Sequence, residues 1–317
     1  MNELEHVPVL LEEALQALKL RENGIYVDAT CGRGGHTRAI LERLGSQGRV
    51  LAFDRDPDAV TTVRQRLATD PRLDLQHAPF SQLQSLLVAR GLHGHVHGIL
   101  FDLGVSSPQL DAPQRGFSFR HDGPLDMRMD PTVGTSAAQW LDSAAEAEIA
   151  SVLHEYGEER YARRIARAVV RARAESPIVT TRQLAEVIAR AVPTRERSKD
   201  PATRSFQAIR IFINRELDEL RQVLPQAVAA LAPGGRLAVI SFHSLEDRLT
   251  KHFLRTEAKG IELPLELPVR AHETHARLRL VGKATRAGDE ETRRNPRARS
   301  AVLRVAERTA EGHANAV

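Results

Sequence analysis

A glycine-rich turn that follows an acidic residue is the first stretch of this sequence whose residue types and spacing suggest chemistry. A short β-rich run ends in Asp28, and Gly32, Gly34 and Gly35 follow it closely. A helix is expected to start near His36. Glycine lets the backbone turn sharply and approach a ligand, and a helix N-terminus offers free N–H groups. The pattern favours nucleotide binding, although glycine turns also serve as plain connectors between a strand and a helix.

A second acid supports the nucleotide-binding interpretation. Residues 49–53 read as a buried strand that ends in Asp54, about twenty residues beyond the turn, where βαβ units place the carboxylate that accepts both ribose hydroxyls. A dinucleotide fingerprint starting at Gly32 would need glycine where this chain has Thr37. An acid before the turn and another after the second strand are instead typical of a site for S-adenosylmethionine (SAM). The alternatives are an NAD(P) site and a structural turn.

Ligands of open α/β sheets bind beyond the carboxyl ends of the strands, and further candidates fall at these ends. Phe80 ends an expected third strand over residues 73–80, where it could stack on adenine or simply pack in the core. His243 follows an expected fifth strand over residues 236–242 and could touch a substrate base. A lone histidine near a strand end is more often merely hydrogen-bonded.

Asp102 ends an expected fourth strand and is the candidate catalytic residue. Methyltransferases that act on an exocyclic amine carry an acid and a tight turn at this position. The amine lone pair is delocalised into the base, so an acceptor for the N–H bonds eases attack on a sulfonium methyl group. Two alternatives remain: Asp102 binds the amino-acid end of the cofactor, which we favour, or it caps a strand–loop corner.

Two further groups of residues are candidates for contact with a nucleic acid. Phe117 and Phe119 lie in a loop between arginines, which suits base stacking, but either ring could instead anchor the loop. Arg293, Arg294 and Arg297 form a cluster suited to phosphate contacts, and a solvated turn would look much the same.

The elements that must position these residues alternate between strand and helix as far as residue 110. Such alternation predicts a Rossmann-like α/β fold with a doubly wound, mostly parallel sheet. A leading helix is expected to begin at Pro8, and a helix is expected over residues 81–90. Residues 277–283 and 298–308 are expected to close the sheet as an antiparallel pair.

The alternation stops in the middle of the chain, where we expect an inserted all-helical subdomain. Capping-box spacing at Ser143 and at Thr180 predicts two helix starts, and residues 205–231 read as one long helix. We therefore expect a first part of the methyltransferase-like domain, the insertion, a second part and a flexible tail, over residues 1–110, 111–203, 204–310 and 311–317. The insertion is expected to help dock RNA.

Composition excludes several classes of protein. The 317 residues contain one cysteine, which rules out an internal disulfide framework and any zinc site built from two cysteines of this chain. No H-E-x-x-H spacing occurs, so no metal is expected. No apolar run approaches the roughly 18 residues of a membrane span, and the first twenty residues are too acidic for a secretory signal, so we expect a cytoplasmic protein. A net charge of +4 permits a nucleic-acid partner without demanding one. The oligomeric state stays open, with a homodimer as one option.

Several long, ordered motifs also resemble those of a known family, the bacterial small-subunit ribosomal-RNA methyltransferase H family (RsmH, formerly MraW). The similarity runs from His6 to about Arg308. The motifs are His6-Val-Pro-Val-Leu10 and the stretches over residues 28–36, 102–110, 115–119, 123–130, 241–247 and 295–301.

The resemblance implies a SAM-dependent enzyme that methylates the N4 amine of one cytosine in the decoding region of 16S rRNA, with the assembled small subunit as preferred substrate. The family's motifs carry over cofactor contacts to Gly34, Gly35, His36, Asp54, Phe80, Asp102 and Gln109. The resemblance alone selects Gln109, and it alone selects rRNA among amine substrates. The alternatives are an NAD(P)-dependent oxidoreductase, disfavoured by Thr37, and a non-catalytic ribosome-assembly factor, disfavoured by Asp102 and the intact glycine turn.

Overall fold

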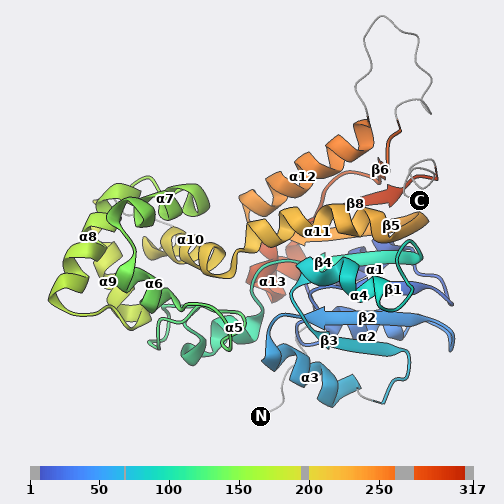
Figure 1. Ribbon diagram of the computed structural model, residues 1–317, viewed down its shortest axis with the longest axis horizontal. Coiled ribbons are helices and arrows are strands. Elements are labelled where there is room, and N and C mark those ends of the chain that lie inside the picture. Colours follow the sequence, from blue (N-terminus) through green and yellow to red (C-terminus); the bar gives the residue numbers. More distant parts are fainter. Residues whose placement is uncertain (1–7, 68, 194–199, 261–274, 311–317) are drawn as a thin grey trace, which may run out of the picture. The chain divides into compact units, whose positions relative to one another are not determined.

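The computed structural model describes residues 8–67, 69–193, 200–260 and 275–310 (Figure 1). His6 and the expected tail after residue 310 lie outside this part of the chain. The chain divides into two compact units: unit 1 is Met1–Gly104 with Leu217–Val317, and unit 2 is Val105–Glu216. Residues 105–110 and 204–216, which we expected in the methyltransferase-like parts, thus fall in unit 2.

The described part of unit 1 is built on one eight-stranded sheet with the order β3-β2-β1-β4-β5-β8-β6, and β7 pairs with β8 (Figure 1). Strands β1 to β5 pair in parallel, whereas β8 runs antiparallel to β5, β6 and β7. The predicted mostly parallel, doubly wound sheet is confirmed. The bounds are β1 Ile25–Asp28, β2 Arg49–Asp54, β3 Leu73–His77, β4 Val96–Asp102, β5 Leu231–Ser241, β6 Leu278–Leu280, β7 Thr285–Arg286 and β8 Val302–Arg308.

Side chains alternate between the two faces of the sheet along each strand, and helices cover both faces with apolar side chains, so both faces are buried. In β4, Ile99 and Phe101 join one apolar cluster and Leu100 joins the other. The first cluster also takes side chains of α4, α11 and α12, and the second takes those of α1, α2 and η4. The helical segments are α1 Leu11–Leu18, α2 Gly35–Leu41, α3 Pro57–Leu67, η1 Phe80–Gln82, α4 Leu83–Val88, α11 Glu216–Ala230, α12 Ser244–Lys259, α13 Asp289–Arg294 and η4 Pro296–Ser300.

Several element boundaries differ from the predictions. Helix α1 starts at Leu11 rather than Pro8, because Leu10 takes a left-handed conformation with φ 52°. Strand β3 ends at His77, so Phe80 lies in η1 beyond the strand. The expected helix over residues 205–231 is broken at Arg215, whose φ is also 52°. Helix α13 and strand β7 were not predicted.

Unit 2 is helical in the part of it that the structure describes, apart from an isolated bridge between Pro124 and Thr180. One apolar cluster around Trp140 holds these helices together. The capping box at Thr180 is confirmed, but the one at Ser143 is wrong, because Ser143 ends α6 and Ala145 precedes α7. The segments are α5 Ser107–Asp111, η2 Pro113–Arg115, α6 Ala137–Ser143, α7 Glu146–Gly157, α8 Ala162–Glu175, α9 Thr181–Ala191 and α10 Ala202–Asn214.

Candidate active site

Asp28 stands at the end of the central strand of the site, β1, and is fully buried. Its Oδ2 accepts the Thr37 hydroxyl at 2.7 Å, and its Oδ1 accepts the Thr30 N–H at 3.4 Å. Burial raises the pKa of Asp28 to about 6, and these hydrogen bonds oppose the rise. Thr37, which breaks the dinucleotide fingerprint, thus ties the start of α2 to the end of β1.

Asp54 ends the neighbouring strand β2 and faces the glycine turn. Its Oδ2 accepts the Gly32 N–H and its Oδ1 accepts the Asp56 N–H, both at 2.9 Å. Burial raises its pKa to about 6. Each carboxylate oxygen can accept more than one hydrogen bond, so capacity remains for two hydroxyl donors. This geometry fits the ribose contact that the sequence predicts, and the contact itself stays a prediction.

The glycine turn needs glycine for two different reasons. Gly34 has φ 82°, a left-handed conformation that side chains disfavour. Gly35 is needed for space, because a Cβ atom there would lie 2.3 Å from Cγ of Pro8. Backbone of the turn is therefore packed closely by the segment that precedes α1.

Asp102, at the end of β4, lies beside His36, the second residue of α2. Asp102 Oδ2 is 3.7 Å from His36 Nδ1. Burial lowers the pKa of His36 to about 4, so the imidazole is neutral at pH 7 and the contact is no ion pair. Burial raises the pKa of Asp102 well above its usual value, and the charges of Asp28 and Glu246 add to the rise.

Two buried polar atoms at this point have no hydrogen-bond partner among the described residues. They are Asp102 Oδ1 and His36 Nε2. A buried polar atom without a partner costs about 1–3 kcal/mol, so such atoms mark places where a ligand can supply the missing hydrogen bond. The residues present thus fit a cofactor that brings donors and positive charge to the strand ends.

Phe80 has a packing partner in the core. Its ring meets Phe101 edge-on, with 5.8 Å between the ring centroids, and remains partly exposed. The following Ser81 N–H donates to Glu219 Oε2 of α11 at 3.2 Å, which fixes η1 in place. Core packing is therefore present, and stacking of the exposed part on adenine stays a prediction.

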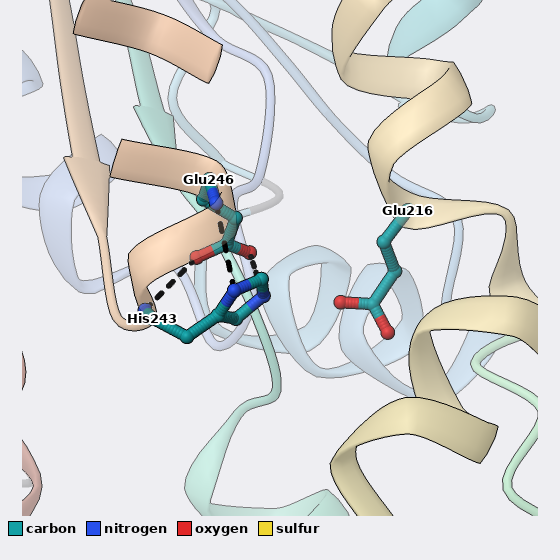
Figure 2. Close-up of side chains that lie close together, drawn as sticks. All are labelled: Glu216, His243 and Glu246. Carbon is teal, nitrogen blue, oxygen red and sulfur yellow. Dashed lines mark hydrogen bonds and ion pairs between the residues drawn. The ribbon is translucent and has the colours of Figure 1, made fainter. Parts of the chain in front are cut away.

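His243 forms the cap of α12 together with Glu246 (Figure 2). Its Nδ1 accepts the Glu246 N–H at 3.5 Å, and its Nε2 lies 3.2 Å from Glu246 Oε1. Glu246 Oε2 in turn accepts the Phe242 N–H at 3.0 Å. Nδ1 is thus used within the cap, which agrees with the hydrogen-bonded alternative, whereas the buried Nε2 forms no hydrogen bond with the described residues. Contact of His243 with a base stays a prediction.

The remaining candidates occupy three other places. Gln109 lies in unit 2, where its side-chain oxygen accepts the Ser106 N–H at 2.9 Å and caps α5. Phe117 is buried in the core of unit 2, and Phe119 meets Phe206 edge-on at 4.8 Å, so both rings anchor their loop. In unit 1, the last turn of α13 exposes Arg293 and Arg294, while Arg297 follows in η4.

The structure therefore gathers the predicted acids, glycines and His36 at one edge of the unit 1 sheet. Sequence reasoning missed two of their supports, Thr37 and Glu246. A signal existed for Glu246, since His243 precedes it by three residues, the spacing of a capping box. No comparable sequence signal predicts that Thr37 hydrogen-bonds Asp28.

A doubly wound sheet with acids at the ends of β1, β2 and β4 around a glycine turn defines a class I SAM-dependent methyltransferase, and its cofactor is SAM. The chain belongs to the MraW methylase family, whose model matches residues 3–309.

Curated relatives match almost the whole chain. The ribosomal RNA small subunit methyltransferase H of Thioalkalivibrio sulfidiphilus is 60% identical over 306 residues, which is 96% of this chain and 98% of that protein. The protein of the same name from Thiobacillus denitrificans is 60% identical over 310 residues, covering 98% and 99%. A solved rRNA methylase from Streptococcus thermophilus covers 95% of this chain and 92% of its own at 12% identity and a TM-score of 0.41, too distant to place any residue. None of the described helices combines the length and the apolar character needed to cross a membrane.

Proposed function

We propose that this methyltransferase acts in the cytoplasm on the N4 amine of a cytosine in the decoding region of 16S rRNA, within the small ribosomal subunit. The observation that carries the proposal is 60% identity, over nearly full length, to relatives named ribosomal RNA small subunit methyltransferase H. The choice of the cytosine N4 amine follows from the resemblance of the motifs and from the chemistry that Asp102 offers.

Asp102 suits an amine that must lose a proton. Bound SAM supplies an electrophilic methyl group, and transfer breaks the sulfur–carbon bond, forms a nitrogen–carbon bond and releases one proton from the amine. The unpartnered Oδ1 of Asp102 can accept an N–H of the amine and orient its lone pair. The raised pKa of Asp102 favours proton uptake by this carboxylate, and the neutral His36 beside it adds no competing positive charge.

Exposed arginines support a partner that carries phosphates. Helix α8 exposes Arg163, Arg164, Arg167 and Arg171, and its only acid is Glu175 near its end. Arg163, Arg167 and Arg171 follow one another at four-residue spacing, about 6 Å apart along the helix axis, and so form a basic stripe. Within it Arg167 also pairs with Glu146, at 3.6 Å. Together with the arginines of α13, the arginines of α8 offer the electrostatic contacts on which RNA affinity depends.

The decisive experiment is methyl transfer from labelled SAM to small subunits that lack the modification, followed by digestion and nucleoside analysis. We expect label in N4-methylcytidine, and none when subunits already carry that methyl group. Label in another nucleoside would keep the enzyme class and overturn the target. SAM binding without any transfer would support the assembly-factor alternative.

Asp102→Asn separates the two roles of this side chain in the same assay. The amide keeps the size of the carboxylate but cannot take up a proton. If Asp102 acts on the amine, kcat should fall by about 10²–10⁴-fold while KM for SAM changes little. A rise in KM with kcat retained would show that Asp102 only binds the cofactor.

A further inference from the structure

Residues 8–10 form a short strap that packs on the glycine turn within unit 1. The Cγ atom of Pro8 occupies the space that a side chain on residue 35 would need, 2.3 Å from its Cβ position. The backbone of Val9 lies close enough to the His36 imidazole to oppose the lowering of its pKa by burial, although Nε2 of that ring forms no hydrogen bond with the described residues. The strap therefore contacts Gly35 and His36, two of the residues that the family's motifs assign to the cofactor.

The strap is held in a conformation that it would not adopt unaided. Leu10 is fully buried and has φ 52°, a left-handed backbone conformation that is uncommon for a bulky residue and costs on the order of 1–3 kcal/mol. The Leu10 N–H donates to Glu291 Oε1 at 2.8 Å. Glu291 lies on α13, so an element near the end of the chain fastens a segment near its beginning.

The hydrogen bond between Leu10 and Glu291 lies close to elements that form the predicted cofactor site. Leu10 packs in the same apolar cluster as Ile40 of α2, the helix that follows the glycine turn, and as Ala298 of η4. Movement of Leu10 would therefore shift both the strap over Gly35 and the backbone beside His36. Glu291 bonds the strap at Leu10, so its effect on the glycine turn would pass through the strap.

We propose that Glu291 is a positioning residue for SAM: by accepting the Leu10 N–H, it holds the strap against Gly35 and His36 and so keeps the cofactor site formed. The proposal concerns the cofactor and is independent of which RNA is methylated. Its observable consequence is a loss of SAM affinity, rather than of the methyl-transfer step, when the acceptor at residue 291 is removed.

Four variants test this, with isothermal titration for SAM affinity and steady-state kinetics for KM and kcat. Glu291→Ala should raise Kd and KM for SAM by about tenfold, which is about 1.4 kcal/mol, and leave kcat at saturating SAM within about twofold. Glu291→Gln keeps an oxygen acceptor of the same reach and should restore SAM affinity. Glu291→Asp keeps the charge but shortens the reach and should be weakened like the alanine variant.

Glu290→Ala is the matched control. Glu290 is the preceding residue of α13, is exposed and pairs with Arg294, so its removal makes the same charge change without touching the strap. It should bind SAM as the unaltered protein does. Unchanged SAM affinity in Glu291→Ala, or equal weakening in Glu291→Gln and Glu290→Ala, would overturn the proposal. If the alanine variant does not fold, the comparison of the Gln and Asp variants decides.

Discussion

Three aspartates at the ends of neighbouring strands have the same side chain but different surroundings, and the differences assign them different tasks. Asp28 and Asp54 accept hydrogen bonds with both carboxylate oxygens. Asp102 lies at the same edge with one oxygen that no group in the described chain satisfies. Asp28 is suited to holding the strand end and the start of α2 together, and Asp54 to binding a ribose. Asp102 is suited to a hydrogen-bond donor that arrives with the cofactor or the substrate.

Replacing Asp54 tests the ribose contact. Asp54→Ala should weaken SAM binding by roughly 1.5–3 kcal/mol, the range for hydrogen bonds to a charged group. Isothermal titration measures this directly. Asp54→Asn is the control, because its one remaining oxygen can still accept the Gly32 N–H and should keep the turn in place. Unchanged affinity in the alanine variant would remove Asp54 from the site.

Acid should weaken SAM binding. Asp54 accepts donors best when ionised, and its pKa is raised to about 6 in the protein without ligand. A ligand that prefers the carboxylate lowers this pKa, so affinity is full above pH 6 and falls by up to about tenfold per pH unit below it. Titrations at several pH values check this. Asp54→Asn should flatten the dependence of SAM affinity on pH. If the variant keeps the same slope, the pH dependence would be assigned to Asp28, whose pKa is also about 6.

The sequence alone predicted these aspartates because strand ends, glycines and acids follow one another in a recognisable order. It could not assign the hydrogen-bond partners, since Thr37 reaches Asp28 only after α2 has packed on the sheet. For His243, the sequence predicts a helix over residues 244–259, as observed, and the spacing to Glu246 is that of a capping box, but it does not show that the imidazole takes the place of the usual Ser or Thr hydroxyl. The packing of Phe117 in the core of unit 2 likewise depends on contacts with residues distant in the sequence, which the local motif does not predict.

Helix α13 and the η4 turn that follows it carry the arginine cluster that the sequence predicts to meet RNA. Neutralising Arg293, Arg294 and Arg297 to glutamine should weaken binding to the small subunit and flatten its salt dependence. The log–log slope should fall by about 0.7–0.9 for each phosphate that the variant no longer neutralises. Affinity for SAM should stay the same, because Glu291 and the strap are retained. Arg221→Gln, on α11 and paired with Asp218, is a control for removal of an exposed arginine outside the insertion that is expected to dock RNA.

Filter binding or fluorescence titration at several salt concentrations gives this slope. An unaltered slope in the triple variant would mean that the cluster is a solvated turn. The basic stripe of α8 would then carry the electrostatic contact, and its arginines would be the next to neutralise.

Element prediction succeeded where periodicity was strong and failed where tertiary contacts decide. Strand β2 begins at Arg49 and ends at Asp54 as predicted, and β4 ends at Asp102 as predicted, because both apolar runs end abruptly at an acid. The break at Arg215 lies within a continuous apolar periodicity and depends on Asn214, whose side chain bonds the backbone of a distant loop. Helix α13 is six residues long and has no buried residue, so no periodic pattern of apolar residues predicts it.

The hydrogen bonds of the Asn214 side chain lead to a prediction about the stability of unit 2. Its Oδ1 accepts the Met129 N–H and its Nδ2 donates to the Met127 carbonyl, both at 2.7 Å. Asn214→Ala would leave two backbone groups without these partners and should destabilise unit 2 by roughly 2–4 kcal/mol. Hydrogen exchange followed by mass spectrometry should show faster exchange in peptides of residues 105–216 than in the unaltered protein.

Peptides of strands β1 to β4 should exchange as before if the two units open separately. Faster exchange throughout both units would show that they unfold together, and no change in either would show that the Asn214 network contributes little. Arg221→Ala, which removes an exposed pair with Asp218, is a control for nonspecific effects.

The hydrogen bond between Leu10 and Glu291 joins residues 281 positions apart, and this bears on how the protein is made. Synthesis adds roughly 5–20 residues per second, so the glycine turn waits on the order of tens of seconds before α13 leaves the ribosome. Strand β8, which lies between β5 and β6, is later still, so the nascent sheet keeps an open edge at β5 until residues 302–308 have been synthesised. A growing chain can thus form β1 to β4 early, yet it should hold SAM firmly only after residues 289–294 of α13 have been synthesised.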